Sequence, residues 1–176
     1  MNAFVTLDEL VDFLRALDDV PSDEGLPFSE LDHQLQCAYE LALAESGDVE
    51  LQVAGLVHDI AHTVGPIEEH ATLGAAMVRA LFGPRVATLV EDHVPAKRYL
   101  VTVDPEYRAQ LSPDSVRTLA LQGGALPAAE VARCERRPHW AASVELRRAD
   151  DRAKTPGREV PGLDHWVPRL REVAAR

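Results

Sequence analysis

Cysteine is scarce in this chain: among 176 residues only Cys37 and Cys134 occur, and they lie far apart in the sequence. Two cysteines cannot supply the disulfide framework of a small secreted domain. They also exclude a metal site built from several thiolate ligands. We therefore interpret both as small buried apolar residues and expect a reducing, cytoplasmic environment.

Long apolar runs and a basic excess are missing as well. No segment approaches the ~18 consecutive apolar residues of a membrane helix. The first 13 residues lack the basic and apolar pattern of a signal peptide, so we expect neither a membrane span nor a signal peptide. The formal net charge of -11 argues against a nucleic-acid partner, because an acidic surface repels phosphate backbones. The neighbouring Lys97 and Arg98 still allow a small anion to bind.

Strand-like alternation is not sustained anywhere, and helix signals dominate. Thr6 and Glu9 have the spacing of a capping box, and Ser112 followed by Pro113 is a typical helix start. After an N-terminal helix, helices are expected at about 29–44, 49–63, 67–82, 85–93, 113–121, 127–134, 140–152 and 163–175, with residues 95–111 irregular or short-helical. The fold class is therefore all-α, with an N-terminal helix in 1–20, the main domain in 21–160 and a C-terminal helix in 161–176.

The most informative segment is 57–62, where His58 and Asp59 are adjacent within an apolar stretch. Burying two such side chains costs several kcal/mol unless each finds a partner, and metal coordination would satisfy both. One oxygen of Asp59 can bind the metal that His58 binds. Its second oxygen can then reach a second metal.

Further imidazole and carboxylate groups are spread along the chain, at His33, His70, His93 and Asp150. Any one of these histidines alone is more often a core or surface residue. Together with His58 and Asp59 they form an ordered set of six ligands, which divides naturally between two metals. Ligands of this type suit iron, manganese, zinc or cobalt.

The order of a histidine, a His-Asp pair and a distant aspartate resembles the HD-domain superfamily, most of whose members are metal-dependent phosphohydrolases. His33, the pair His58 and Asp59, and Asp150 match that signature. His70 and His93 resemble the extra pair of its dinuclear members. The resemblance implies a compact all-α bundle with a dinuclear metal site in its centre.

Six segments narrow the resemblance to one branch, the mixed-valent di-iron oxygenases that cleave the carbon–phosphorus bond of organophosphonates. The segments are 31–39, 56–62, 91–101, 111–115, 122–124 and 147–154, and the similarity extends over about 29–165. The segment 93–101, with Lys97, Arg98 and Tyr99, is the most specific, because the general signature does not require it.

The branch implies two irons, Fe(II) and Fe(III), with O2 as co-substrate and a small anionic phosphonate as substrate. The first iron would be held by His33, His58, Asp59 and Asp150, and the second by Asp59, His70 and His93. His62 and Lys97 would be catalytic residues that contact the phosphonate, with Ser115 and Gln122 as further substrate contacts.

The chain departs from the branch just before its first histidine. The branch has a tyrosine that ligates the second iron and a glutamate that reads an amino group of the substrate. Asp23 and Leu26 stand at the matching positions. This departure leaves open a 1-hydroxyphosphonate other than the aminated one.

Three functions are compatible with these residues. The first is an oxygenase that releases phosphate and a carboxylic acid, the second a phosphohydrolase of a small phosphate ester, and the third a non-catalytic metal-binding domain. Dinuclear phosphodiesterases of the superfamily usually have a lysine where this chain has His62. That difference and the segment 93–101 favour the oxygenase.

Overall fold

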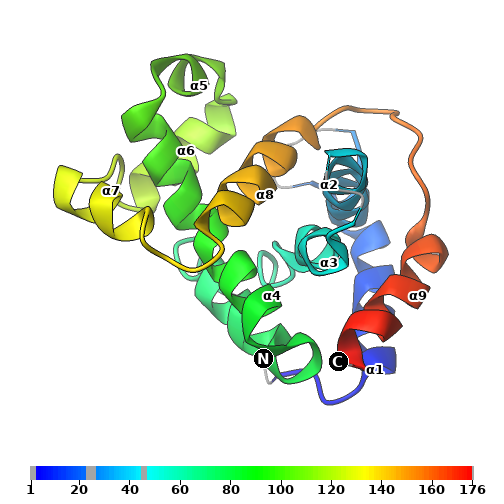
Figure 1. Ribbon diagram of the computed structural model, residues 1–176. Helices are drawn as coiled ribbons and strands as arrows, with labels where there is room; N and C mark the ends of the chain where they lie inside the picture. Colours follow the sequence, from blue (N-terminus) through cyan, green and yellow to red (C-terminus); the bar gives the residue numbers. More distant parts are fainter. Residues whose placement is uncertain (1–2, 23–26, 45–46, 176) are drawn as a thin grey trace.

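The computed structural model describes residues 3–22, 27–44 and 47–175, and in that part the chain folds into helices joined by turns and loops (Figure 1). The elements are α1 (Leu7–Ala16), the short 3-10 helix η1 (Leu17–Asp19), α2 (Glu30–Ala44), α3 (Val49–Val57), α4 (His70–Val103), α5 (Pro105–Gln110), α6 (Pro113–Leu121), α7 (Ala128–Cys134), α8 (Trp140–Arg152) and α9 (Leu163–Ala174). The predicted all-α fold class is confirmed.

The two terminal helices pack against each other on one side of the molecule (Figure 1). The predicted capping box starts α1: the Thr6 side chain accepts from the Glu9 amide, and the Glu9 carboxylate accepts from the Thr6 amide. Between the helices, Arg15 lies 3.2 Å from Asp164. Below these polar contacts, the apolar faces of both helices join the main core.

Four helices, α2, α3, α4 and α8, meet in the centre of the molecule (Figure 1). Helices α2 and α3 approach closely at Gly55, where an added Cβ would lie 2.5 Å from a methyl group of Leu41 and 3.4 Å from the backbone of Ala38. Glycine at this position therefore lets the two helices nearly touch. As a result, His33 on α2 and His58 at the end of α3 come within reach of one another.

The helix predicted at 49–63 ends earlier in the structure than expected. Helix α3 stops at Val57, and residues 58–64 form turns in which the Ile60 amide donates to the Val57 carbonyl at 3.2 Å and the His62 amide to the Asp59 carbonyl at 2.9 Å. These bonds join residues three apart and wind the chain more tightly than an α-helix. Polar side chains that an α-helix would spread over its surface are thereby turned toward one side.

Helix α4 is two helices joined at a kink. Gly83, with φ 77° and ψ −175°, breaks it between the helices expected at 67–82 and 85–93. The second arm then continues to Val103, so the expectation of an irregular or short-helical segment at 95–111 is wrong up to 103, whereas the short α5 agrees with it. Its buried residues recur at helical spacing, namely Val90, His93, Ala96, Lys97, Leu100 and Val101. Packing of this face keeps Pro95 inside a helix that proline alone would disfavour.

By length and apolarity alone, α4 could cross a membrane, but half of its most apolar window is buried inside the protein. Core helices of soluble proteins share that property, so this is weak evidence for a membrane span. Both cysteines are buried and unpaired, as expected, and burial raises the pKa of each thiol.

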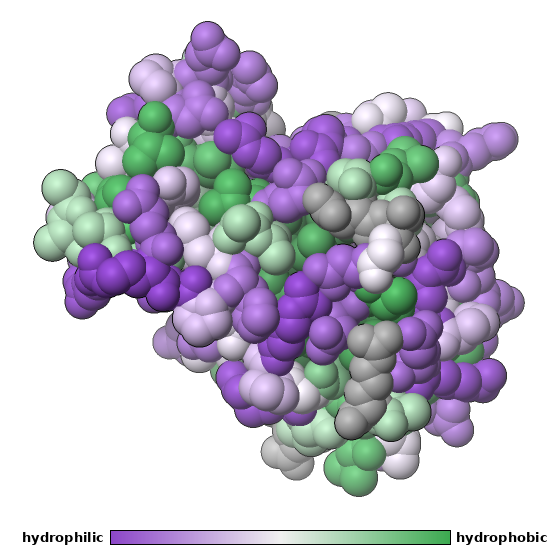
Figure 2. All heavy atoms as spheres, in the orientation of Figure 1, coloured by the Kyte–Doolittle hydropathy of each residue, from purple (hydrophilic) through white to green (hydrophobic). Residues whose placement is uncertain are grey.

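Helices α5, α6 and α7 form a separate group beside α4 and α8 (Figure 1). In Figure 2, apolar side chains gather over this region, while most of the face in view is hydrophilic. Helix α6 begins as predicted, with Ser112 as its N-cap accepting from the Ser115 amide at 3.1 Å. Its buried residues Ser115 and Thr118 face the central helices and form one wall of a cavity.

Candidate metal centre

Four histidines of the predicted ligand set are fixed in the same way. Each ring hydrogen-bonds through Nδ1 to a backbone carbonyl, and a carbonyl can only accept, so Nδ1 carries the hydrogen. The four bonds are His33 to Ala153 at 2.9 Å, His58 to Gly55 at 2.9 Å, His70 to Ile67 at 2.5 Å and His93 to Val90 at 2.6 Å. In the neutral rings, every Nε2 atom then presents a lone pair.

These Nε2 atoms converge in two pairs. The Nε2 atoms of His33 and His58 lie 3.3 Å apart, and those of His70 and His93 lie 2.9 Å apart. Where both rings are neutral, two lone pairs at such distances repel each other, whereas a proton or a metal ion shared by them is attracted by both. The donor arrangement therefore fits a metal ion at each pair.

Asp59 joins the two pairs. Its Oδ2 lies 3.3 Å from His58 Nε2 and 3.6 Å from His33 Nε2. Its Oδ1 lies 3.3 Å from His70 Nε2 and 3.4 Å from His93 Nε2. This Oδ1 is buried and has no hydrogen-bond partner among the described residues, as expected of an oxygen that binds a metal. The carboxylate can thus bridge two ions.

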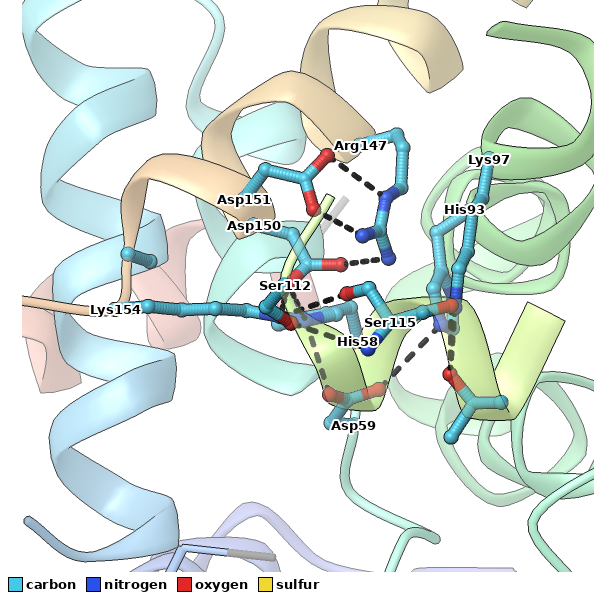
Figure 3. Close-up of polar contacts among 12 residues, drawn as sticks. His58, Asp59, His93, Lys97, Ser112, Ser115, Arg147, Asp150, Asp151 and Lys154 are labelled. Atoms are coloured by element: carbon cyan, nitrogen blue, oxygen red, sulfur yellow. Dashed lines mark hydrogen bonds and ion pairs between the residues drawn. The ribbon is translucent and has the colours of Figure 1, made fainter. Parts of the chain in front are cut away.

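Asp150, on α8, completes the first pair. Its Oδ1 lies 3.3 Å from His33 Nε2, and its Oδ2 accepts from Arg147 at 2.5 Å (Figure 3). The buried Arg147 also binds Asp151 and donates to the Tyr107 hydroxyl at 3.0 Å. One oxygen of Asp150 is therefore held by protein while the other is turned to the site.

Charge in the cluster is set by burial and by neighbouring groups. Burial raises the pKa of Asp59, but His58 and His33 outweigh it and hold the pKa well below its usual range. Burial lowers the pKa of His93 to about 4. Burial also acts to lower the pKa of His33, but Asp150 and Asp59 outweigh it and raise that pKa to about 9. The bridging carboxylate is therefore ionised and His93 neutral, the forms that bind metals.

A cavity of about 50 Å³ adjoins the cluster, and all four predicted substrate contacts line it: His62, Lys97, Ser115 and Gln122. Lys97 is 2% exposed and donates from Nζ to Thr118 at 2.6 Å. Burial first, and then the nearby Arg147, lower the pKa of Lys97 to about 8. Gln122 Oε1 is buried without a hydrogen-bond partner among the described residues.

The structure separates the pair Lys97 and Arg98. The Arg98 side chain donates to the carbonyl of Gly124 at 2.8 Å, and the Tyr99 hydroxyl donates to Glu135 at 3.1 Å. Only Lys97 lines the cavity. Arg98 thus holds the turn after α6, next to Gln122, rather than an anion.

Sequence reasoning missed several charged residues of the cavity, among them Lys154 and Glu30. Lys154 Nζ lies 3.9 Å from Asp150 Oδ1 and donates to Ser115 at 3.4 Å (Figure 3). Its spacing of four residues from Asp150 could have revealed it. Glu30, 4% exposed, also lines the cavity, 3.5 Å from His62. Asp23 and Leu26, which matter for the departure from the resembled branch, lie outside the described residues.

Comparisons with known proteins agree with this geometry. The HD domain family model matches residues 31–122. The chain is 36% identical to hydroxymethylphosphonate dioxygenase of Gimesia maris, over 87% of this chain and 84% of the relative. It is 32% identical to [1-hydroxy-2-(trimethylamino)ethyl]phosphonate dioxygenase (glycine-betaine-forming) of Leisingera caerulea, over 93% of this chain and 90% of the relative. An uncharacterized protein of Acanthamoeba polyphaga mimivirus is 28% identical, over 78% of this chain and 68% of the relative.

Proposed function

The chain belongs to the HD-domain family, close to its hydroxyphosphonate dioxygenases, and we propose that it is a di-iron oxygenase of this type. It uses O2 to cleave the carbon–phosphorus bond of a 1-hydroxyphosphonate, releasing phosphate and a carboxylic acid. The observation that carries the proposal is the similarity to two named hydroxyphosphonate dioxygenases. The geometry of Asp59 between two histidine pairs, beside a cavity with a buried lysine, supports it.

We propose hydroxymethylphosphonate as the substrate. The residues matching the amine-reading glutamate and the tyrosine of the resembled branch are Leu26 and Asp23. With one molecule of O2, hydroxymethylphosphonate yields formate, phosphate and one proton, which balances atoms and charge. The relative with 36% identity carries this substrate in its name.

The protein's own groups bind and orient the substrate. Lys97 and Lys154 offer two cations to the phosphonate dianion, and the Ser115 hydroxyl and the Gln122 amide offer hydrogen bonds. His33, His58, Asp59 and Asp150 would hold one iron, and Asp59, His70 and His93 the other. An iron pair would supply the one-electron chemistry that reaction with O2 requires.

A phosphohydrolase remains the second candidate, because a dinuclear centre with lysines beside it also suits a phosphate ester. The ligand set does not distinguish the two reactions. The named relatives and the histidine at position 62 favour the oxygenase.

The test is metal analysis and EPR spectroscopy of anaerobically purified, partly oxidised protein, followed by turnover assays. We expect two irons per chain, an EPR signal of a coupled Fe(II)/Fe(III) pair that changes with hydroxymethylphosphonate, and O2 uptake equal to phosphate release. The amino and trimethylammonio analogues should react more slowly. Phosphate release from esters without O2 uptake, with redox-inert metals bound, would replace this proposal with hydrolysis.

A further inference from the structure

Glu30 is a buried carboxylate in an anion-binding cavity. It is the first residue of α2, its side chain is 5% exposed, and it lines the same cavity as Lys97 and Lys154. Burying a carboxylate costs free energy, and beside a dianionic substrate it is also repelled. Such a group needs a role that outweighs both costs.

The residue that Glu30 faces is His62. Glu30 Oε2 lies 3.5 Å from His62 Nδ1. A second contact holds the His62 ring, which packs edge-on against the ring of His70 with the ring centroids 5.4 Å apart. In an imidazole the two nitrogens point in different directions, so a ring held at Nδ1 by Glu30 turns Nε2 away from it. His62 itself lines the cavity.

We propose that Glu30 is a positioning residue that orients His62 toward the phosphonate. The Glu30 carboxylate faces Nδ1 of His62, and Nε2 on the other side of the ring is then left for a phosphonate oxygen. A carboxylate behind a histidine fixes the orientation of its ring. This inference rests on the proposed function, since it requires that the cavity bind a phosphonate.

The charges of the cavity fit this arrangement. Glu30 faces His62, and Lys97 and Lys154 of the same cavity remain to balance a phosphonate dianion. A glutamate in the first turn of a helix is also favourable for the helix itself, which is why the sequence alone gave no signal of this second role.

The first experiment compares Glu30→Gln with the wild type in the iron-loaded enzyme. We expect iron content to be unchanged, while KM for hydroxymethylphosphonate and the calorimetric Kd of methylphosphonate, an analogue without the hydroxyl group, rise about tenfold. The change in kcat should be smaller. Glu40→Gln is the matched control, because Glu40 lies on the same helix and pairs with Arg152 at 2.8 Å, away from the cavity.

A double-mutant cycle shows whether Glu30 acts through His62. If it does, Glu30→Gln adds nothing to the loss already caused by His62→Asn. Independent, multiplying losses in the double variant, or loss of iron in Glu30→Gln, would overturn the inference. If Glu30→Gln does not fold, Glu30→Asp replaces it: weaker methylphosphonate binding at full iron content supports the inference, and unchanged binding refutes it. Failure of the wild type to bind methylphosphonate and consume O2 would instead refute the proposed function.

Discussion

The two halves of the metal centre are built differently. The first half draws His33, His58 and Asp150 from three separate elements, α2, the end of α3 and α8. The second half draws both His70 and His93 from α4, 23 residues apart. With the shared Asp59, the first half has four donors among the described residues and the second has three.

This difference has a physical origin and a chemical consequence. The kink at Gly83 folds α4 so that its first and second arms each present one histidine to the same point. Within the described ligand groups, His70 and His93 have no carboxylate besides the shared Asp59. A metal in the second half would therefore have more coordination positions open to other ligands. The first half is closed by Asp150 and its Arg147 partner. We expect the first half to anchor its metal and the second to exchange ligands.

The largest effect should come from removing the ligand that both halves share. Asp59→Ala leaves each histidine pair without its bridging oxygen, so we expect both metals to be lost and turnover to fall below detection. Metal analysis by mass spectrometry and O2 uptake measure this. Asp92→Asn is the control, because the buried Asp92 pairs with Arg137 instead of facing the cluster. Two metals retained in Asp59→Ala would disprove the bridging assignment.

Smaller losses of metal should distinguish the two halves of the centre. His93→Ala removes a donor from the second half only, leaving four donors for the first, so about one metal per chain should remain. His58→Ala should leave less metal bound at the same free concentration, because only the three-donor half stays intact. Titration with Fe(II) under anaerobic conditions measures both. Equal losses in the two variants would show that the halves do not differ in strength.

The two halves should also differ in how protons compete with metal. The pKa of His33 is raised to about 9, so below that pH a proton must leave before a metal binds. The pKa of His93 is lowered to about 4, so no proton competes there near neutral pH. The pKa of His58, in the same half, is also raised well above its usual value. Affinity of the first half should therefore rise with pH, by about tenfold per pH unit for each proton that leaves. Calorimetry in buffers of different ionisation enthalpy counts the released protons, and an undiminished release in His33→Ala would contradict a contribution from His33.

Part of the candidate site could be predicted, because only a few residue types serve as metal ligands. His58 beside Asp59 is a weak signal alone and gains its weight from the ordered set with His33, His70, His93 and Asp150. Ser112 with Pro113 marks a helix start by local geometry alone. The structure brings all six predicted ligands together. It also places the four predicted substrate contacts around one cavity.

The errors lie where tertiary packing overrides local signals. Residues 95–111 were expected to be irregular or short-helical, but the buried face through Leu100 continues α4 to Val103. The apolar run around Val57 indicated a longer α3, but the turns after it serve the cluster instead. Glu30 had no sequence signal, because its contact with His62 joins residues that only the fold brings together.

The smallest effect should come from a substitution that leaves both halves of the metal centre intact and changes only the cavity. Lys97 donates to Thr118 and contacts no ligand of the cluster in any described hydrogen bond. Lys97→Ala should therefore keep two metals while KM for the phosphonate rises about tenfold, the loss expected for one charge-assisted hydrogen bond. Because burial lowers the pKa of Lys97 to about 8, its cation is present below that pH and lost above it. The wild-type KM should accordingly increase above pH 8, and Lys97→Ala should flatten that increase. Loss of metal in Lys97→Ala would instead show that the cavity and the metal centre are one structural unit.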